Sequence, residues 1–234
     1  MSIRTDVVLP CLNEAAALPG VLAALPRDVR AIVVDNGSTD GSAEVARDAG
    51  ALVVEAPLRG YGAAVHAGLC AATAPVVVFC DADGSFDLSQ IDRVAGPVHR
   101  DESDLVFGRR RVVSAAAWPV HARFANSVLL ASVRRRTGLP VRDLGPFRAG
   151  RREQLLALGL EDRRSGYPLE LLLRAWQEGL RIGEVDVDYR PRLGRSKVTG
   201  TVRGTITAVA DMQRMLRRHA GGAGHAGARS RTWA

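Results

Sequence analysis

The sequence predicts an α/β protein with a mostly parallel sheet flanked by helices. Over the first hundred residues, short valine-rich runs alternate with stretches of helical spacing. This alternation is typical of βαβ units, whose parallel strands are buried on both faces and are therefore continuously apolar. The chain has 234 residues, 47% of them apolar, which is enough for one sizeable core. We expect a single domain over residues 1–218.

The strands of the first half are expected where the chain is most apolar. They are residues 6–10, 31–35, 51–55, 76–80 and 105–107. A helix-like stretch follows each of the first three strands. These helices are expected at residues 13–25, from residues 39–40 onward, and at residues 62–72.

The second half is less regular. Residues 118–136 predict a helix that ends on three arginines, with Gly138 and Pro140 behind it as stop signals. The further elements expected are a short strand at 145–149, a helix at 167–178, a strand at 181–189, a loop at 190–200 and a helix at 201–218. Residues 219–234 have little apolar surface to bury, so we expect a disordered tail.

Charge divides the chain into an acidic and a basic half. Residues 1–100 hold 7 arginines and 12 acidic residues, whereas residues 101–234 hold 25 basic and 13 acidic residues. The acidic half is suited to a metal ion and the basic half to phosphates or an anionic surface. A basic nucleic-acid-binding module is an alternative. With 5% aromatic residues and no recognition motif, however, the sequence favours a protein that binds no nucleic acid.

The sequence predicts a cytoplasmic protein. No apolar run approaches the ~20 residues of a membrane-spanning helix, and the amino terminus leads directly into a strand without a signal-peptide layout. Three cysteines without C-x-x-C spacing favour free thiols. The basic helix at 118–136 is compatible with peripheral contact at the inner face of the membrane, or equally with a core helix that has a charged end.

Three polar clusters follow strands of the first half: PCLNE at 10–14, DNGSTDGS at 35–42 and DADGSFD at 81–87. In doubly wound sheets, ligands bind beyond the carboxyl ends of the strands. The three clusters are therefore expected at one edge, as a single site.

The cluster DADGSFD has two interpretations when taken alone. It can hold a metal against a phosphate, or Asp81 can be the nucleophile of an aspartyl-phosphate phosphohydrolase. The second interpretation expects the motif after the first strand of its fold, whereas here it follows the fourth apolar run. A dinucleotide fingerprint beginning at Gly60 fails because Val65 stands at its third glycine position.

Six motifs in order resemble the family 2 glycosyltransferases: PCLNE, VVDNGSTDGS, RGYGAAVHAGL, VVVFCDADGSFD, GPFRA and RPRLGRSKV. Within that family the chain is most similar to the polyprenyl-phosphate (dolichol-phosphate) mannosyl- and glucosyltransferase branch. The similarity covers roughly residues 5–215. It implies a type A glycosyltransferase (GT-A) fold, with a nucleotide-sugar-binding half at 1–108 and an acceptor-binding half at 109–218.

The resemblance implies a nucleotide diphosphate sugar as donor and Mg²⁺ or Mn²⁺ as cofactor. Asp81 and Asp83 would bind the ion, since hard carboxylate oxygens suit both metals. Asp81 would also face the ribose. The other residues implied to bind the nucleotide sugar are Pro10, Leu12, Glu14, Asp35, Gly37, Arg195, Ser196 and Lys197.

The resemblance further implies inverting transfer of a hexose to a phosphate-bearing acceptor, above all polyprenyl phosphate. The residues expected to assist transfer or to bind the acceptor phosphate are Asp83, Arg109, Arg123, Arg148, Arg192 and Lys197. A phosphate acceptor is already ionised and needs no general base. A soluble hydroxyl acceptor, such as a sugar phosphate or glycerate, would need one, and Asp143 and Glu170 are the candidates.

The chain departs from the family pattern at a few positions. Cys11 and Asn36 replace residues common near the base pocket, Asn36 standing for the second acid of an Asp-Asp pair. After Asp83 the chain lacks the glutamine that completes the metal shell in relatives, so we expect Asp87 or water there. The carboxyl-terminal membrane helices of many relatives are not expected.

Overall fold

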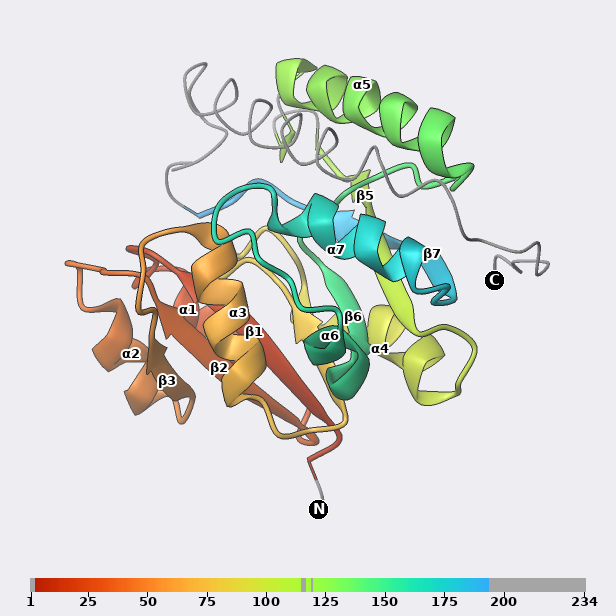
Figure 1. Cartoon of the computed structure of the whole chain (residues 1–234). Coiled ribbons are helices and arrows are strands. Elements are labelled where there is room, and N and C mark those ends of the chain that lie inside the picture. Colours follow the sequence, from red (N-terminus) through yellow and green to blue (C-terminus); the bar gives the residue numbers. More distant parts are fainter. Residues whose placement is uncertain (1–2, 115–116, 119, 194–234) are drawn as a thin grey trace.

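The computed structural model describes residues 3–114, 117–118 and 120–193, and the strands within them form one sheet in the order β3-β2-β1-β4-β6-β5-β7 (Figure 1). Of these strands, β6 alone runs antiparallel to its neighbours. The carboxyl ends of the other six strands therefore share one edge. The strands are β1 (Thr5–Cys11), β2 (Val29–Asp35), β3 (Leu52–Glu55), β4 (Val76–Phe79), β5 (Leu105–Val112), β6 (Arg148–Arg151) and β7 (Ile182–Tyr189).

Helices cover both faces of the sheet. One core lies under α3, α5, α6 and α7, and the other lies under α1, α2 and α4. This explains the continuously apolar strands, since side chains on both faces of β1 and β4 are buried. The helices are α1 (Leu18–Ala23), α2 (Ser42–Asp48), α3 (Tyr61–Ala71), α4 (Ile91–His99), α5 (Val120–Thr137), α6 (Arg152–Ala157) and α7 (Tyr167–Gln177), with the 3₁₀ turn η1 (Leu88–Gln90) before α4.

The predicted strands and helices among these residues are confirmed in type, with shifted ends. The first helix begins at Leu18 instead of residue 13, because Asn13 has φ 54° and Pro19 stands in the first turn of the helix. Strand β5 continues five residues beyond the predicted Phe107, to Val112, because its whole length pairs with β7. Helices α4 and α6 were not predicted.

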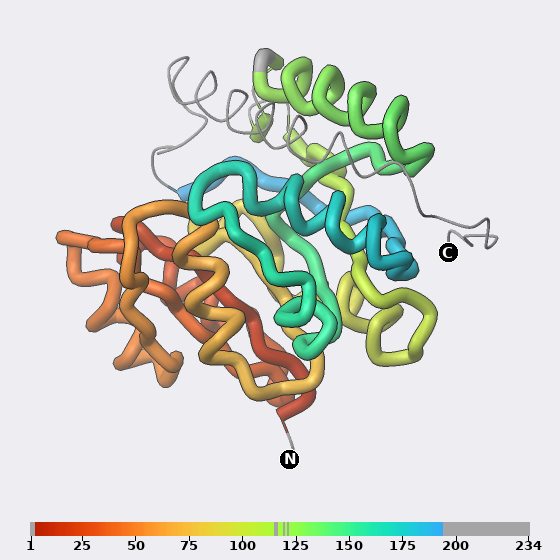
Figure 2. Tube along the Cα trace, in the orientation of Figure 1, coloured from red at the N-terminus to blue at the C-terminus, as the bar shows by residue number. Residues whose placement is uncertain are grey.

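The second half of the chain returns into the sheet. Figure 2 follows the chain as it places β6 between β4 and β5. Pairing begins at Arg148, opposite Phe79 and Phe107, so β6 starts later than the predicted strand at 145–149. Because β6 is antiparallel, its first residue lies at the edge where the other strands end.

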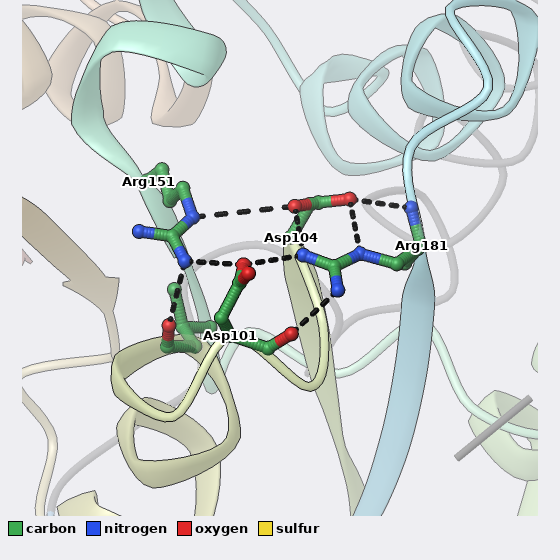
Figure 3. A network of polar contacts seen from close by, with 5 residues as sticks. Asp101, Asp104, Arg151 and Arg181 are labelled. Carbon is green, nitrogen blue, oxygen red and sulfur yellow. Dashed lines mark hydrogen bonds and ion pairs between the residues drawn. The ribbon is translucent and has the colours of Figure 1, made fainter.

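A network of ion pairs holds the opposite edge of the sheet (Figure 3). The Asp104 carboxylate accepts from the backbone N–H of Arg181 at 2.8 Å and from its guanidinium Nη2 at 2.9 Å. Asp101 accepts from both Arg181 and Arg151. The network thus ties the starts of β5 and β7 to the end of β6, away from the polar clusters.

Several predictions fall outside the described residues. These are the helix at 201–218, the tail at 219–234, most of the loop at 190–200, and the site residues Arg195, Ser196 and Lys197. No helix within the described ranges is long and apolar enough to cross a membrane. The three cysteines are free thiols; Cys11 and Cys80 are buried and Cys70 is exposed.

Candidate active site

Side-chain hydrogen bonds tie the loop after β1 to the loop after β2. The Asn13 Oδ1 atom accepts from the Thr39 N–H at 2.7 Å. The Asn13 N–H donates to the Ser38 hydroxyl at 2.9 Å, and the Glu14 N–H donates to the Ser42 hydroxyl at 2.8 Å. These hydrogen bonds join the first two polar clusters, residues 10–14 and 35–42, into one wall at the carboxyl edge of the sheet.

The predicted base-pocket residues lie on this wall. Cys11 pairs in register with Asp35, so the two strands end side by side. The Asp35 carboxylate accepts from the Ser38 N–H at 3.1 Å and shapes the following turn. Gly37 has φ +88°, and a Cβ there would lie 3.1 Å from the Arg59 guanidinium. The structure brings together Pro10, Leu12, Glu14, Asp35 and Gly37, and their contacts with a nucleotide remain a prediction.

Asn36 has a structural task that explains its departure from the family pattern. Its Nδ2 donates to the Gly60 carbonyl at 2.8 Å, and its Oδ1 accepts from the Gly60 N–H at 3.3 Å. An amide can donate and accept at once, whereas an aspartate could only accept. Asn36 thus fastens the loop after β3 to the end of β2.

The glycines of Gly60-Tyr61-Gly62 serve close packing, not dinucleotide binding. A Cβ at Gly60 would lie 2.3 Å from the Arg163 carbonyl oxygen, and one at Gly62 would lie 2.7 Å from the Asp162 carbonyl oxygen. The Gly62 N–H donates to the Arg164 carbonyl at 3.1 Å. The start of α3 is therefore packed against the loop that precedes α7.

The acidic pair, Asp81 and Asp83, lies directly after β4. Asp83 is 5% exposed, and its Oδ1 accepts from the Ser85 N–H at 3.0 Å. Its Oδ2 lies 3.2 Å from the Arg192 guanidinium. Burial, followed by the charge of Asp83, raises the pKa of Asp81 to about 7. The two carboxylates thus repel one another in a desolvated setting that favours binding of a cation.

The segment after β7 is hydrogen-bonded to the acidic cluster, which is the segment DADGSFD at residues 81–87. The Arg190 N–H donates to the Ser85 carbonyl, and the Leu193 N–H donates to the Asp83 carbonyl, both at 2.9 Å. Arg190 also pairs with Asp87 at 3.1 Å. The last described residues before the predicted lid therefore lie on the acidic cluster itself.

Arg110 is the β5 arginine that the structure brings to the acidic pair. Its guanidinium makes a bidentate pair with Asp143 at 2.8 and 2.7 Å and lies 3.7 Å from the Trp118 ring centroid. Its positive charge counts among those that oppose the raised pKa of Asp81. These contacts hold one cation in a fixed place beside the carboxylates.

Arg109, which the sequence analysis placed among the catalytic residues, lies elsewhere. Its Nε and Nη2 atoms donate to Asp186 of β7, on a partly exposed part of the sheet. Successive side chains of a strand point to opposite faces, so only one of the two arginines can face the acidic pair. In this structure Arg109 is engaged by Asp186, and the catalytic role expected of it stays a prediction.

Arg148 is fully buried at the start of β6. Its Nη2 donates to the Tyr61 hydroxyl at 2.6 Å, and its guanidinium lies 5.8 Å from the Phe79 ring centroid. Its Nε and Nη1 atoms have no hydrogen-bond partner in the structure. Its charge also opposes the raised pKa of Asp81. Arg148 is thus a buried cation with two guanidinium nitrogens that have no hydrogen-bond partner among the described residues.

The two candidate bases are both engaged by arginines. Asp143 is 1% exposed and accepts from Arg110 at its side chain and backbone N–H. Glu170 is also 1% exposed; it accepts from the N–H groups of Glu161 and Asp162 and from Arg174. In these contacts Asp143 holds Arg110 and Glu170 holds the loop before α7, and a role of either carboxylate as a base stays a prediction.

Two further predicted site residues are not gathered around the acidic pair. Arg123 is exposed on α5. Asp87, expected as a third metal ligand, caps η1 by accepting from the Ser89 N–H at 3.0 Å. Within the described parts of the chain, no group of three or more His, Cys, Asp or Glu side chains is placed to hold a metal ion.

The acidic pair nevertheless fits a divalent ion completed by substrate. Mg²⁺ in particular is usually held by one or two carboxylates together with waters and substrate phosphates. In this structure the Arg192 guanidinium supplies a positive charge to Asp83. Asp81 and Asp83 are the residues that would bind the ion.

Sequence signals existed for some of the residues missed. Side chains alternate between the two faces of a strand, so the sequence indicates that Arg109 and Arg110 point to opposite faces. It does not indicate which of the two points toward the site, since that depends on how the strand pairs in the sheet. Tyr61 and Trp118, which contact Arg148 and Arg110, carried no signal, because their partners are far apart in the sequence.

The sheet order and the acidic pair after β4 define the type A glycosyltransferase fold, and the comparisons agree. The model of Glycosyl transferase family 2 matches residues 6–157. An uncharacterized glycosyltransferase of Mycobacterium tuberculosis is 52% identical over 90% of this chain and 96% of its own length. A dolichyl-phosphate hexose transferase of Haloferax volcanii is 35% identical over 82% of this chain and 85% of its own.

A solved structure extends the similarity to the fold. Glucosyl-3-phosphoglycerate synthase from Mycobacterium tuberculosis, in complex with Mn²⁺, UDP-glucose and phosphoglyceric acid, is 26% identical. It superposes with a TM-score of 0.71 over 90% of this chain and 79% of that one. The chain belongs to glycosyl transferase family 2 and is a glycosyltransferase. This membership replaces the phosphohydrolase and nucleic-acid interpretations.

Proposed function

We propose that this glycosyltransferase moves a hexose from a nucleotide diphosphate sugar to a phosphate-bearing acceptor, polyprenyl phosphate above all, with inversion. One observation carries the proposal: directly after β4, the buried Asp83 lies 3.2 Å from the Arg192 guanidinium. Two neighbouring acids with an arginine beside them are suited to a metal ion and phosphate groups.

The acidic pair is proposed to bind the donor diphosphate through Mg²⁺ or Mn²⁺. The bound ion would stabilise the negative charge that develops on the departing nucleoside diphosphate. Asp81 and Asp83 hold the donor at the edge, and the wall formed by the loops after β1 and β2 binds its base. The solved relative with Mn²⁺ and UDP-glucose supports this assignment.

Arg110 is proposed to bind the acceptor phosphate, with the buried Arg148 supplying further positive charge. The bidentate bond with Asp143 fixes the Arg110 fork in advance, so little side-chain entropy is lost on binding. Arg192 contacts Asp83 in this structure. When a metal ion binds Asp83 instead, the Arg192 guanidinium is proposed to turn to the donor diphosphate or to the acceptor phosphate. Arg123 remains a candidate contact for the acceptor.

A phosphate acceptor also fits the state of the candidate bases. Asp143 and Glu170 each carry an arginine partner, Arg110 and Arg174, so both carboxylates are already engaged in ion pairs. An ionised phosphate needs no base, so positioning and charge stabilisation are sufficient.

The lid is proposed to come from Arg195, Ser196 and Lys197. Lys197 is four residues beyond Leu193, whose N–H bonds to the Asp83 carbonyl. A chain spans at most ~3.5 Å per residue, so four residues can bridge up to about 14 Å. A segment of this length is long enough to bring a lysine to a diphosphate bound at the acidic pair.

A soluble hydroxyl acceptor of the sugar phosphate or glycerate type is the second candidate. It is favoured by the structural similarity to glucosyl-3-phosphoglycerate synthase. Similarity to the dolichyl-phosphate hexose transferase, at 35% identity, favours the lipid phosphate. With a lipid acceptor, the enzyme is expected at the cytoplasmic face of the membrane as a peripheral protein.

The test is a transfer assay with labelled nucleotide sugars, Mn²⁺ and either polyprenyl phosphate or 3-phosphoglycerate. We expect transfer to the lipid phosphate and, in Arg110→Met, a rise of about ten- to a hundredfold in acceptor KM, since a charged hydrogen bond contributes ~1.5–3 kcal/mol. Arg109→Met, on the opposite face of the same strand, is the matched control and should keep the wild-type KM. Transfer to 3-phosphoglycerate alone would contradict the lipid acceptor and support the second candidate.

A further inference from the structure

Helix α5 carries an exposed apolar stripe. The side chains of Val120, Phe124 and Val128 are 79%, 70% and 52% exposed. They are four residues apart, so they follow one another along one face of the helix. An exposed phenylalanine between two exposed valines is more than the isolated apolar residue that surfaces commonly show.

The orientation of α5 is fixed by its other face. Leu130 and Val133 are 1% and 0% exposed and belong to the core under α3 and α7. The Asn126 Oδ1 accepts from the Leu144 N–H at 3.4 Å. The helix therefore has two apolar faces, one packed on the domain and one directed away from it.

The charge of α5 indicates what could cover the exposed face. The helix contains Arg123, Arg134, Arg135 and Arg136, all exposed, and no acidic residue. Arginine stems lie along an apolar boundary while the guanidinium groups reach anionic headgroups. Apolar side chains beside arginines, without acids, are the pattern of a helix lying in a membrane interface.

A second copy of the chain fits this face less well. In a two-fold dimer the same surface meets itself, and α5 offers no carboxylate to the arginines of a partner helix. An anionic lipid surface supplies both the apolar layer and the negative charge.

The position of α5 agrees with a lipid partner. Figure 1 shows the helix beyond the edge at which β5 ends, outside the layer of α3 and α7. Strand β5 leads from the Arg110 region to α5, and the exposed Val113 lies between them. A membrane on this face would lie beside the arginines proposed for the acceptor phosphate.

We infer that α5 is a membrane-docking helix that binds anionic bilayers through Val120, Phe124 and Val128 with its arginine cluster. The inference deepens the proposed function and rests on it for its purpose, because docking would bring the site to a lipid-linked acceptor. The surface itself can be tested without any transfer reaction.

The experiment is flotation of the full chain with vesicles of phosphatidylcholine alone or mixed with phosphatidylglycerol. We expect binding to the mixed vesicles only, weakened by salt. Phe124→Ser should reduce the partition coefficient by at least about tenfold, since burying a phenylalanine contributes more than the 1.4 kcal/mol of one tenfold step. Replacing Arg134, Arg135 and Arg136 by Gln should remove the salt dependence.

Leu58→Ser is the matched control, because Leu58 is 60% exposed and lies outside α5. It should float as the wild type does, and circular dichroism should show both serine variants folded. The inference is overturned if wild-type protein ignores anionic vesicles, if Phe124→Ser floats equally well, or if that variant instead changes the oligomeric mass. Phe124→Ser should bind nucleotide sugars as the wild type does, because Phe124 lies on the docking surface. If the wild-type protein bound no nucleotide sugar at all, that result would contradict the proposed function but not the membrane docking of α5.

Discussion

At the scale of single residues, the site is defined by the two carboxylates of Asp81 and Asp83 and by the arginine that neutralises one of them. Asp83 is buried with the Arg192 guanidinium 3.2 Å away, and Asp81 is held partly protonated near neutral pH. A buried carboxylate without a counter-charge would be costly, so the arginine stabilises the free protein. A divalent ion would compete with Arg192 for the same carboxylate.

The pKa of Asp81 predicts how metal binding depends on pH. The carboxyl has a pKa of about 7 in the folded chain, against 3.8 as its ordinary value, so the metal-free protein loses stability as pH rises between these values. A metal needs the ionised form. Calorimetric Mn²⁺ titrations should therefore show about tenfold weaker binding one pH unit below this pKa than one unit above it. Asp81→Asn should lack that step, and equal affinity on both sides would contradict the assignment.

Asn36 yields a prediction about the loop after β3. Asn36→Asp would replace the Nδ2 donor with a carboxylate oxygen. That oxygen would face the Gly60 carbonyl oxygen, so two hydrogen-bond acceptors would lie against each other. We expect a loss of ~1–3 kcal/mol in the free energy of unfolding, measured with urea. Asn36→Ala, which leaves both Gly60 groups open to water, should lose less. A fully stable Asn36→Asp would show that the reciprocal bonds contribute little.

The sequence predicted the residue types of the site better than their roles. Asp81 and Asp83 could be chosen because a strand end and local spacing identify them. Arg109 was expected at the site and Arg110 was not, because the face of a strand depends on pairing with a distant partner, here β7. For the same reason nothing in the sequence revealed that Asp143 is bound to Arg110. The pair of Glu170 and Arg174 is different, since the two residues are four apart on one helix, where side chains are neighbours.

At the scale of elements, α3 lies unusually close to the sheet. A Cβ at Gly68 would lie 2.3 Å from Val8 Cγ1 and 2.9 Å from Val34 Cγ2. Gly68→Ala should force the helix outward and lower the free energy of unfolding by ~1–3 kcal/mol. Gly20→Ala in α1 is the matched control: no atom lies within 4 Å, so alanine should stabilise the helix by about 0.5–1 kcal/mol. Equal effects in urea unfolding would refute the close packing.

The elements that the sequence predicted are those with a strong local pattern. Strands β1, β2 and β4 are continuous apolar runs, and α7 has a clear apolar face. Helix α4 was missed because Gly96 and Pro97 stand inside it, which local propensity disfavours. The six-residue α6 is too short for periodicity to be distinct.

At the scale of the whole molecule, the sheet places the three polar clusters and Arg148 at one edge. The carboxyl ends of β1, β2, β4, β5 and β7 meet there, together with the start of the antiparallel β6. That the first three polar clusters share this edge followed from the βαβ pattern. The insertion of β6 between β4 and β5 did not, since strand order depends on contacts far apart in the sequence.

The metal-bridged donor site is tested most directly by the melting temperature of the protein with a panel of nucleotide diphosphate sugars, with and without Mn²⁺. We expect at least one donor to raise the melting temperature by several degrees only when the metal is present. In Asp83→Asn the rise should be lost while the protein stays folded. An equal rise without metal, or an undiminished rise in Asp83→Asn, would contradict the metal-bridged donor site.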